Sequence, residues 1–349
     1  KFHDGSNFTA DDVLFSFDRI RQPQGTMGIY VAGVKEMKKV DDHTLDVILD
    51  KPNPTMLNNF TTFFIMSKAW AVKNKTEKVQ DYRNKEETFA SRNANGTGPY
   101  IIKENRTYDQ IFGDMPEGNG EKSLCLFPEK ITPNHHKLAR DYVLLDNTYV
   151  EGEVSADGHE WTMGAYATDF VERIWPMSYG HNQDRKYAYP SEGRFKIAEP
   201  AGGYLWDRAK AAKVTYRSYG EFVNNGATTN DPCSTLVPTL QGHFDPHFRS
   251  FDMDYSDLAR ADRFISELHR FEREGEMPRL QIVRLPNDHT AGTSTGKPTP
   301  TAYMAENDLA LGRVVEAVSK SKFWASTAIF VVEDDAQKGP DHIDAHRTI

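Results

Sequence analysis

The hydrophobic and polar positions of the first hundred residues predict a helix and a strand. Val13, Phe17 and Ile20 recur at a spacing that places them on one helical face. Thr9 stands where it would cap this helix. Residues 45–49 alternate between apolar and polar side chains, which is typical of a half-buried strand.

The rest of the chain contains apolar runs that end abruptly in polar clusters. The runs and the clusters that follow them are Tyr100–Ile102 before Glu104–Asn105, Tyr142–Leu145 before Asp146–Asn147, Leu280–Leu285 before Pro286–His289, and Ala328–Val332 before Glu333–Asp335. Between the last two runs, a helical pattern turns five apolar residues toward a core: Leu309, Leu311, Val314, Val315 and Val318. This alternation predicts an α/β fold with a mostly parallel sheet flanked by helices. Ligands bind at the carboxyl ends of the strands in such sheets, so the polar clusters are expected to meet at one edge.

Charge is distributed unevenly along the 349 residues. Residues 1–100 hold 14 Lys and Arg against 13 Asp and Glu, and the whole chain holds 42 against 51, which leaves 28 against 38 for the remainder. A segment with a net charge of −10 argues against a nucleic-acid partner, because phosphate backbones select basic surfaces. No apolar run reaches the ~20 residues of a membrane span. Two cysteines make no metal motif, and free thiols are expected.

The polar clusters supply candidate metal ligands. Glu104–Asn105, Asp288–His289 and Asp334–Asp335 each follow an apolar run, and each alone fits an ordinary turn or helix cap. Three such clusters, with His342 and His346 nearby in the sequence, favour a metal site. Oxygen ligands suit Ca²⁺, Mg²⁺ or Mn²⁺, and the histidines would admit Zn²⁺ or Fe.

Ser155 is the candidate nucleophile. It stands just ahead of a helix expected to start near Asp157, where a serine is most often an N-cap. The same position offers free backbone N–H groups and positive potential to a phosphoryl oxygen. A neighbouring metal ion would orient and activate the hydroxyl. His159, four residues on, is expected one turn along the same helical face.

Specific motifs in residues 1–98 carry a first resemblance. "KFHDGSNFTADDVLFSFDRI", "VDDHTLDVILDKPNP" and "NGTGPY" resemble the family 5 extracellular solute-binding proteins, which serve ABC importers of peptides, nickel or related solutes. The resemblance implies a periplasmic or extracellular origin. It also implies a partial domain, because the family's second lobe is absent from this segment.

Several separated motifs in residues 99–349 carry a second resemblance. "YIIKENRTYDQIFGD", "ITPNHHKLARDYVLLDNTYVEGEVSADGHEW", "PAGGYLWD", "RLPNDHTAGTS" and "FVVEDDAQKGPDHIDAHRT" resemble phosphoesterases of the alkaline phosphatase superfamily. The branch is that of acid phosphatases and phospholipase C enzymes, whose members are usually fused to a β-propeller. The nucleophile turn of sulfatases, Cys/Ser-x-Pro-x-Arg, does not accompany Ser155, so the sulfatase reading is rejected.

The second resemblance implies roles for particular residues. Ser155 would be the nucleophile with His159 beside it, and Glu104, Asn105, Asp334 and Asp335 would be metal ligands. Two further sets follow from the same motifs. Asp288, His289 and His346 would hold a second metal ion or the phosphate, and His135, His136 and His342 would contact phosphate or substrate.

The sequence therefore predicts a solute-binding-protein fragment in residues 1–98 and a metal-dependent phosphoesterase domain in residues 99–349. Its substrate would be a small phosphate mono- or diester. Two alternatives stay open, namely a solute-binding component of an ABC importer and a fusion without a joint function.

Overall fold

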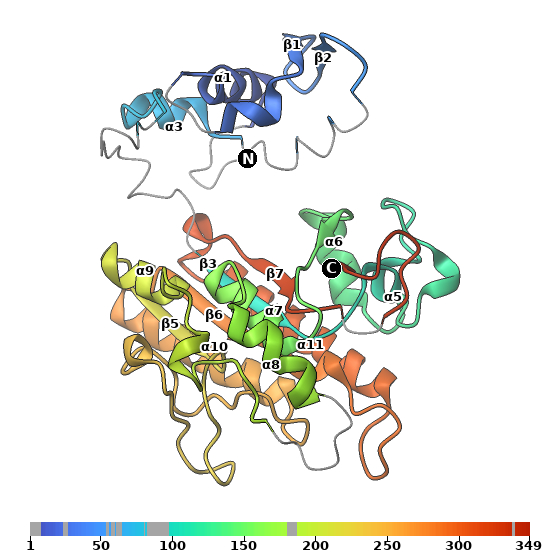
Figure 1. Ribbon diagram of the computed structural model, residues 1–349, viewed down its shortest axis with the longest axis vertical. Coiled ribbons are helices and arrows are strands. Elements are labelled where there is room, and N and C mark those ends of the chain that lie inside the picture. Colours follow the sequence, from blue (N-terminus) through green and yellow to red (C-terminus); the bar gives the residue numbers. More distant parts are fainter. Residues whose placement is uncertain are drawn as a thin grey trace. The chain divides into compact units, whose positions relative to one another are not determined.

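Figure 1 shows a computed structural model of the chain, which divides into two units. Unit 1 comprises Lys1–Thr97 with Ala325–Thr327, and unit 2 comprises Gly98–Trp324 with Ala328–Ile349. The structure describes residues 8–23, 27–53, 56, 60, 65–79, 81, 98–179, 187–336 and 339–349. The motif residues 1–7 and the junction at Gly96–Thr97 lie outside this part of the chain.

Unit 1 contains the helix and the strand that the pattern predicts. Helix α1 spans Ala10–Ile20, and the Thr9 backbone N–H donates to the Asp12 carboxylate at 2.9 Å, which satisfies one donor at the helix start. Phe17 is buried in a small apolar core that also includes residues of β1. The remaining elements of this unit are η1 (Met27–Val31), β1 (Val34–Lys39), β2 (Leu45–Leu49), which pairs antiparallel with β1, and α3 (Lys68–Lys73).

Unit 2 is built on a four-stranded sheet in the order β5-β6-β3-β7, in which every pairing is parallel. The strands are β3 (Gly98–Lys103), β5 (Tyr216–Tyr219), β6 (Leu280–Arg284) and β7 (Phe330–Glu333). The predicted fold class, a parallel sheet flanked by helices, is confirmed. Because all four strands run the same way, their carboxyl ends form one edge.

Helices and short segments connect these strands. They are α5 (Tyr108–Phe112), η3 (Lys122–Leu124), α6 (Pro133–Asp141), α7 (Ser155–Gly164), α8 (Asp169–Tyr179), η4 (Lys196–Ala198), α9 (Leu205–Ala211), η5 (Pro238–Leu240), α10 (Asp257–Glu274), η6 (Pro286–His289), α11 (Pro300–Lys320) and η7 (Trp324–Ser326). A small antiparallel pair joins β4 (Thr148–Tyr149) to β8 (Arg347–Thr348).

Alternate residues of the central strands serve two separate cores. Ile101 and Val283 pack with residues of α10 and α11, and Ile102 and Ile282 pack with residues of α7 and α9. Side chains of a strand point alternately to opposite faces, so near-continuous apolar runs are what a sheet covered on both faces requires. Figure 1 shows the sheet of unit 2 with these helices on its two sides.

Two expectations about apolar segments are wrong. Tyr142–Leu145 is not a strand: α6 ends at Asp141, the Tyr142 N–H still donates to Leu138 O at 3.0 Å, and Val143 is 71% exposed. Without a neighbouring strand this short apolar run has nothing to pair with. Leu309 is 47% exposed, whereas Leu311, Val314 and Val318 are buried as expected. In α11 the core-facing stripe lies beside Leu309 rather than through it.

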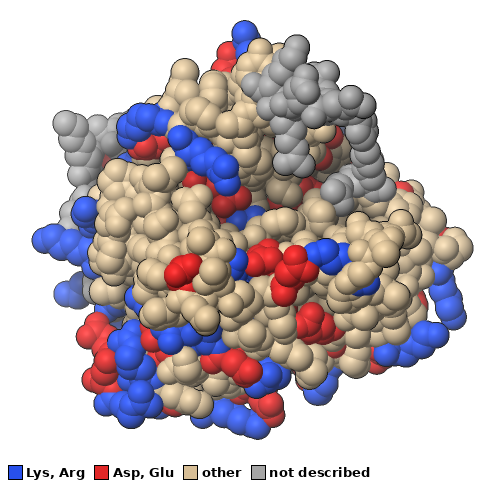
Figure 2. Space-filling view, turned by 90° about the horizontal axis from the view of Figure 1, so that it is seen from below, with Lys and Arg blue, Asp and Glu red and all other residues tan. Residues whose placement is uncertain are grey.

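The surface carries charges of both signs. On the face of the molecule in Figure 2, Lys and Arg side chains are interspersed with Asp and Glu side chains, and neither sign forms a continuous field. Among the described residues, no helix is both long enough and apolar enough to cross a membrane. Cys125 and Cys233 are free thiols, as expected.

Candidate functional site

Each strand of the unit 2 sheet delivers a charged side chain at or just beyond its carboxyl end. Glu104 follows β3, Arg284 closes β6, Asp334 follows β7, and Glu221 lies two residues beyond β5. The Asp334 backbone N–H donates to Lys103 O at 3.0 Å, which extends the pairing of β3 and β7 past the ends of the strands. Parallel pairing thus brings residues that are up to 230 positions apart in the sequence to one edge, because it aligns the ends of neighbouring strands.

Helix α7 completes the site with Ser155 and His159. Ser155 is the first helical residue rather than the N-cap, because Asp157 caps the helix by accepting from the N–H groups of Glu153 (3.0 Å) and Val154 (2.9 Å). The Ser155 hydroxyl is therefore free to donate to Asp335 Oδ2 at 3.0 Å. The first residue of α7 thus directs its hydroxyl at Asp335, beyond the end of β7, and does not use it to cap the helix.

A glycine allows α7 to approach the end of β7 closely. A Cβ atom on Gly158 would lie 2.3 Å from the carbonyl oxygen of Asp334, a distance that real Cβ atoms essentially never show. Any side chain at this position would push the helix away from the strand.

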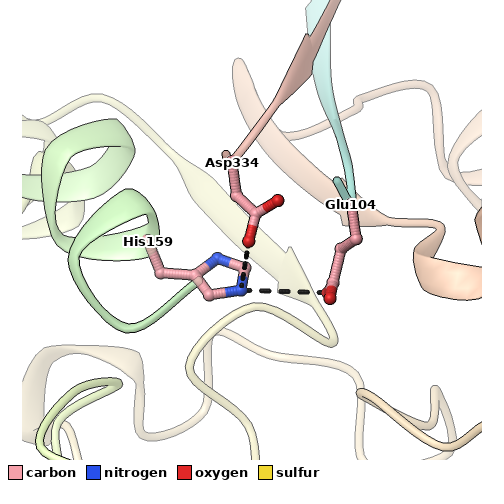
Figure 3. Close-up of side chains that lie close together, drawn as sticks. All are labelled: Glu104, His159 and Asp334. Carbon is pink, nitrogen blue, oxygen red and sulfur yellow. Dashed lines mark ion pairs between the residues drawn. The ribbon is translucent and has the colours of Figure 1, made fainter. Parts of the chain in front are cut away.

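His159 lies among carboxylates, as Figure 3 shows for Glu104 and Asp334. Its Nε2 is 3.4 Å from Asp334 Oδ2 and 3.8 Å from Glu104 Oε1, and its Nδ1 is 2.9 Å from Glu221 Oε1. Burial and the Arg284 charge oppose protonation, but Glu221 and Glu192 outweigh them and raise the pKa of His159. Glu104, His159 and Asp334 offer one ligand atom each within 4.8 Å of one another.

The Arg284 guanidinium lies between these acids. Its Nε donates to Glu104 Oε1 at 2.6 Å, its Nη1 donates to Glu192 Oε2 at 3.0 Å, and its Nη2 lies 2.7 Å from His159 Nε2. Burial opposes the charge, but the surrounding carboxylates raise the pKa of Arg284 well above its ordinary value. Arg284 therefore compensates part of the buried negative charge.

The Asp334 carboxylate accepts no hydrogen bond from the described residues, although His159 Nε2 lies 3.4 Å from its Oδ2. Both of its carboxylate oxygens are buried without a hydrogen-bond partner among the described residues, and so is Oδ1 of Asn105. Burial, and then the negative charges of Asp335 and Glu104, raise the pKa of Asp334 well above its ordinary value. Leaving a buried carboxylate without hydrogen bonds is costly, and a bound cation would relieve the cost.

The donor set fits a divalent metal ion. Asn105 sits in the left-handed backbone region at φ 69°, and its Nδ2 donates to Asp335 Oδ1 at 2.6 Å. Asn105 Oδ1, the Asp334 oxygens, Asp335 and the Ser155 hydroxyl form an oxygen-rich set, which suits Ca²⁺, Mg²⁺ or Mn²⁺. Glu104 borders this set, and His159 would also admit Zn²⁺ or Fe. We call Glu104, Asn105, Ser155, His159, Asp334 and Asp335 the strand-end cluster.

Asp288 lies next to the strand-end cluster, but both of its carboxylate oxygens contact other groups. Its Oδ1 accepts from the Glu104 backbone N–H at 3.1 Å, and its Oδ2 lies 2.8 Å from Lys103 Nζ. The neighbouring His289 ring lies 2.9 Å from Thr290 O and packs edge to face on Phe251. In this structure, Asp288 supports the backbone of Glu104.

The other candidate histidines have partners of their own. His135 lies 2.6 Å from Asp308 Oδ1 and 2.8 Å from Lys103 Nζ, and burial followed by the Lys103 charge lowers its pKa to about 4. His136 lies 2.8 Å from Asp114 Oδ1. The structure does not place these two rings within the groups of potential metal ligands found among the described residues.

His342 and His346 lie in the C-terminal segment. His342 Nδ1 is 2.7 Å from Asp109 Oδ2 and belongs with Asp109 and Asp341 to a second group of potential ligands. Both oxygens of Asp109 accept hydrogen bonds, from the N–H groups of Glu121 and His342, so the Asp109 carboxylate already has hydrogen-bond partners. His346 pairs with Asp344 at 2.9 Å and with Glu153 at 3.3 Å, outside the strand-end cluster.

Sequence reasoning missed Arg284, Glu192 and Glu221. Arg284 carried a usable signal, since it is a charge at the end of a mostly apolar buried strand. Glu221 follows a strand whose sequence, YRSY, lacks an apolar run. Glu192 lies in a loop and reaches Arg284 only through the tertiary fold.

Comparison with known proteins gives two findings. The family model of bacterial extracellular solute-binding proteins, family 5 middle, matches residues 1–112, so the first resemblance is confirmed and continues into β3 and α5 of unit 2. The search of curated proteins found no match.

Two solved structures are similar to this chain. One is a protein in the alkaline phosphatase superfamily from Vibrio parahaemolyticus, at 14% identity and TM-score 0.44, with 72% of this chain and 58% of that chain covered. The other is the proposed sulfatase yidJ from Bacteroides fragilis, at 12% identity and TM-score 0.43, with 72% and 64% covered. This chain spans less than two thirds of the length of either protein.

Proposed function

We propose that residues 99–349 form a metal-dependent phosphoesterase domain with Ser155 as the nucleophile. The observation that carries the proposal is the buried carboxylate of Asp334, whose oxygens accept no hydrogen bond among the described residues, beside the Ser155–Asp335 hydrogen bond. A buried acid without hydrogen bonds, next to a hydroxyl at a helix start, is an arrangement that a cation and a phosphoryl group would complete.

The reaction would proceed by phosphoryl transfer to Ser155 and then hydrolysis of the phosphoserine. Ser155 Oγ loses its proton and forms a bond to phosphorus while the bond to the leaving oxygen breaks. The leaving oxygen takes up a proton, so that one proton passes overall from the serine to the alcohol. Asp335 orients the hydroxyl, and the free N–H groups at the start of α7 face the phosphoryl oxygens. Water then hydrolyses the phosphoserine and releases phosphate.

A divalent ion would be held by Asn105, Asp334 and Asp335, with Glu104 beside them. When bound, it would supply positive charge to the attacking oxygen and to the phosphoryl oxygens. Arg284 and His159 would keep Glu104 in place through the contacts described above. The ion's identity (Ca, Mn, Zn, Mg or Fe) is part of the proposal to be tested.

The test is hydrolysis of p-nitrophenyl phosphate and bis(p-nitrophenyl) phosphate after chelation and readdition of each metal. Metal-restored turnover is expected, and the ratio of the two rates distinguishes a monoesterase from a diesterase. Ser155→Ala should lower turnover by roughly 10³-fold or more while metal content by mass spectrometry stays unchanged. Ser319→Ala, which replaces a half-buried serine of α11 that donates to Glu316 O, is the matched control. Full activity of Ser155→Ala would disprove the nucleophile assignment.

The match of residues 1–112 favours a second candidate function, solute binding for an ABC importer. The description of that family as extracellular also supports a periplasmic or extracellular location. Calorimetric titration with peptides and nickel should give heat without turnover if this function operates. Absence of heat would leave the phosphoesterase, or a fusion without a joint function. Mass spectrometry of native peptides covering residues 90–110 would test whether the fused chain exists as one polypeptide.

A further inference from the structure

An exposed phenylalanine lies beside the guanidinium of the site. Phe251 is 40% exposed, and its ring centroid is 5.8 Å from Arg284 Cζ. Its backbone is firmly held, since Asn225 Nδ2 donates to Phe251 O at 3.0 Å and Asn225 Oδ1 accepts from the Ser250 N–H at 2.7 Å. The exposed part of this large apolar side chain, on an ordered backbone, offers an apolar surface to a ligand.

Tyr189 is linked to the same guanidinium through Glu192. The Tyr189 hydroxyl donates to Glu192 Oε1 at 3.2 Å, and Glu192 Oε2 accepts from Arg284 Nη1. Arg284 Nη1 also donates to Ser250 Oγ at 3.2 Å, next to Phe251. Arg284 Nη1 therefore contacts both Glu192, which pairs with Tyr189, and Ser250, which precedes Phe251.

Tyr179 extends this aromatic surface. Its ring centroid lies 6.3 Å from that of Tyr189, and 44% of the residue is exposed. Tyr189, Glu192 and Arg284 link Tyr179 to the site. We call Phe251, Tyr179 and Tyr189 the aromatic rim.

We propose that the aromatic rim binds a planar aromatic group in the leaving part of the phosphate ester. This proposal rests on the proposed phosphoesterase function and names its substrate class. Charged groups at the base of the site would hold the phosphoryl group. Aromatic rings at its edge would stack on an adjacent ring, an interaction that an aliphatic group of the same size cannot reproduce.

The experiment compares kcat/KM for benzyl phosphate and cyclohexylmethyl phosphate, or for their methyl diesters if the diester is the better substrate. The two leaving groups are primary alcohols of similar size, so the comparison isolates aromatic character. We expect benzyl phosphate to be favoured by about three- to tenfold. Phe251→Ala and Tyr179→Ala should each lower this ratio toward one. Phe251→Leu should lower it too while keeping apolar contact.

The control is Tyr149→Ala, which removes a tyrosine of similar exposure (43%) from β4 and should leave the ratio unchanged. Adenosine 5′-monophosphate separates two sources of the ring: a rate that falls in the rim variants indicates a nucleobase, and an unaffected rate indicates a ring attached close to phosphorus. Metal-restored turnover with equal kcat/KM for both esters would overturn this proposal alone. No turnover of any ester with any metal would overturn the phosphoesterase function itself.

Discussion

Replacing Asp334 by asparagine should stabilise the metal-free protein and abolish its response to metal. Asp334 is buried, neither of its oxygens accepts a hydrogen bond among the described residues, and Asp335 and Glu104 repel its charge. Asparagine keeps the shape and removes the charge. An unsatisfied buried group costs more when it is charged, so removing the charge should raise the free energy of unfolding of the metal-free variant by about 1–3 kcal/mol.

Differential scanning calorimetry in EDTA would measure this gain. In a domain of this size, about 1 kcal/mol corresponds to roughly 2–4 °C, so a gain of about 1–3 kcal/mol should raise the transition of unit 2 by about 2–12 °C. Addition of Mn²⁺, Ca²⁺ or Zn²⁺ at ~100 times its Kd should stabilise the unmodified protein by about 2.7 kcal/mol, and the variant by far less.

Asp169→Asn is the matched control, because Asp169 is an exposed carboxylate in a surface pair with Arg173. Its transition should shift little in either condition. The reasoning would be refuted by an Asp334→Asn protein that is less stable than the unmodified chain in EDTA. It would also be refuted by a variant that keeps the full metal-induced shift.

Three further changes probe the architecture around the cluster. Gly158→Ala should separate α7 from the end of β7 and weaken metal affinity at least tenfold by titration calorimetry, and undiminished affinity would contradict the close approach. Burial raises the pKa of Glu160 to about 7 from 4.5, so the stabilisation by its protonated form is complete below pH 4.5 and about 3 kcal/mol of it is lost as pH rises through 7. In Glu160→Gln, the free energy of unfolding in urea should therefore depend less on pH between 4.5 and 7. An unchanged pH dependence would count against this assignment. Arg284→Gln leaves several buried carboxylates uncompensated and should cost about 3–5 kcal/mol in urea unfolding, so a loss below 1 kcal/mol would be inconsistent with its buried ion pairs.

Local pattern was sufficient for three of the four strands in the parallel sheet. The apolar runs that became β3, β6 and β7 are continuous because both faces of the sheet are covered. The fourth strand, β5, was difficult to predict because its sequence, YRSY, contains no apolar run. The run Tyr142–Leu145 is apolar but does not form a strand, because an apolar run becomes a strand only where a neighbouring strand can pair with it.

The sequence by itself determined the parallel α/β architecture and the placement of Glu104, Asn105, Asp334 and Asp335 directly after strands. It could do so because strand period and strand ends are local properties, and parallel pairing then aligns those ends. Only the tertiary structure decided which histidine reaches these acids, and that Arg284, Glu192 and Glu221 surround it. Those contacts depend on how α7 and the long loops cross the sheet edge, which no spacing along the chain encodes. They hold buried charges together across more than 60 residues of sequence, where only the folded chain can supply the compensation.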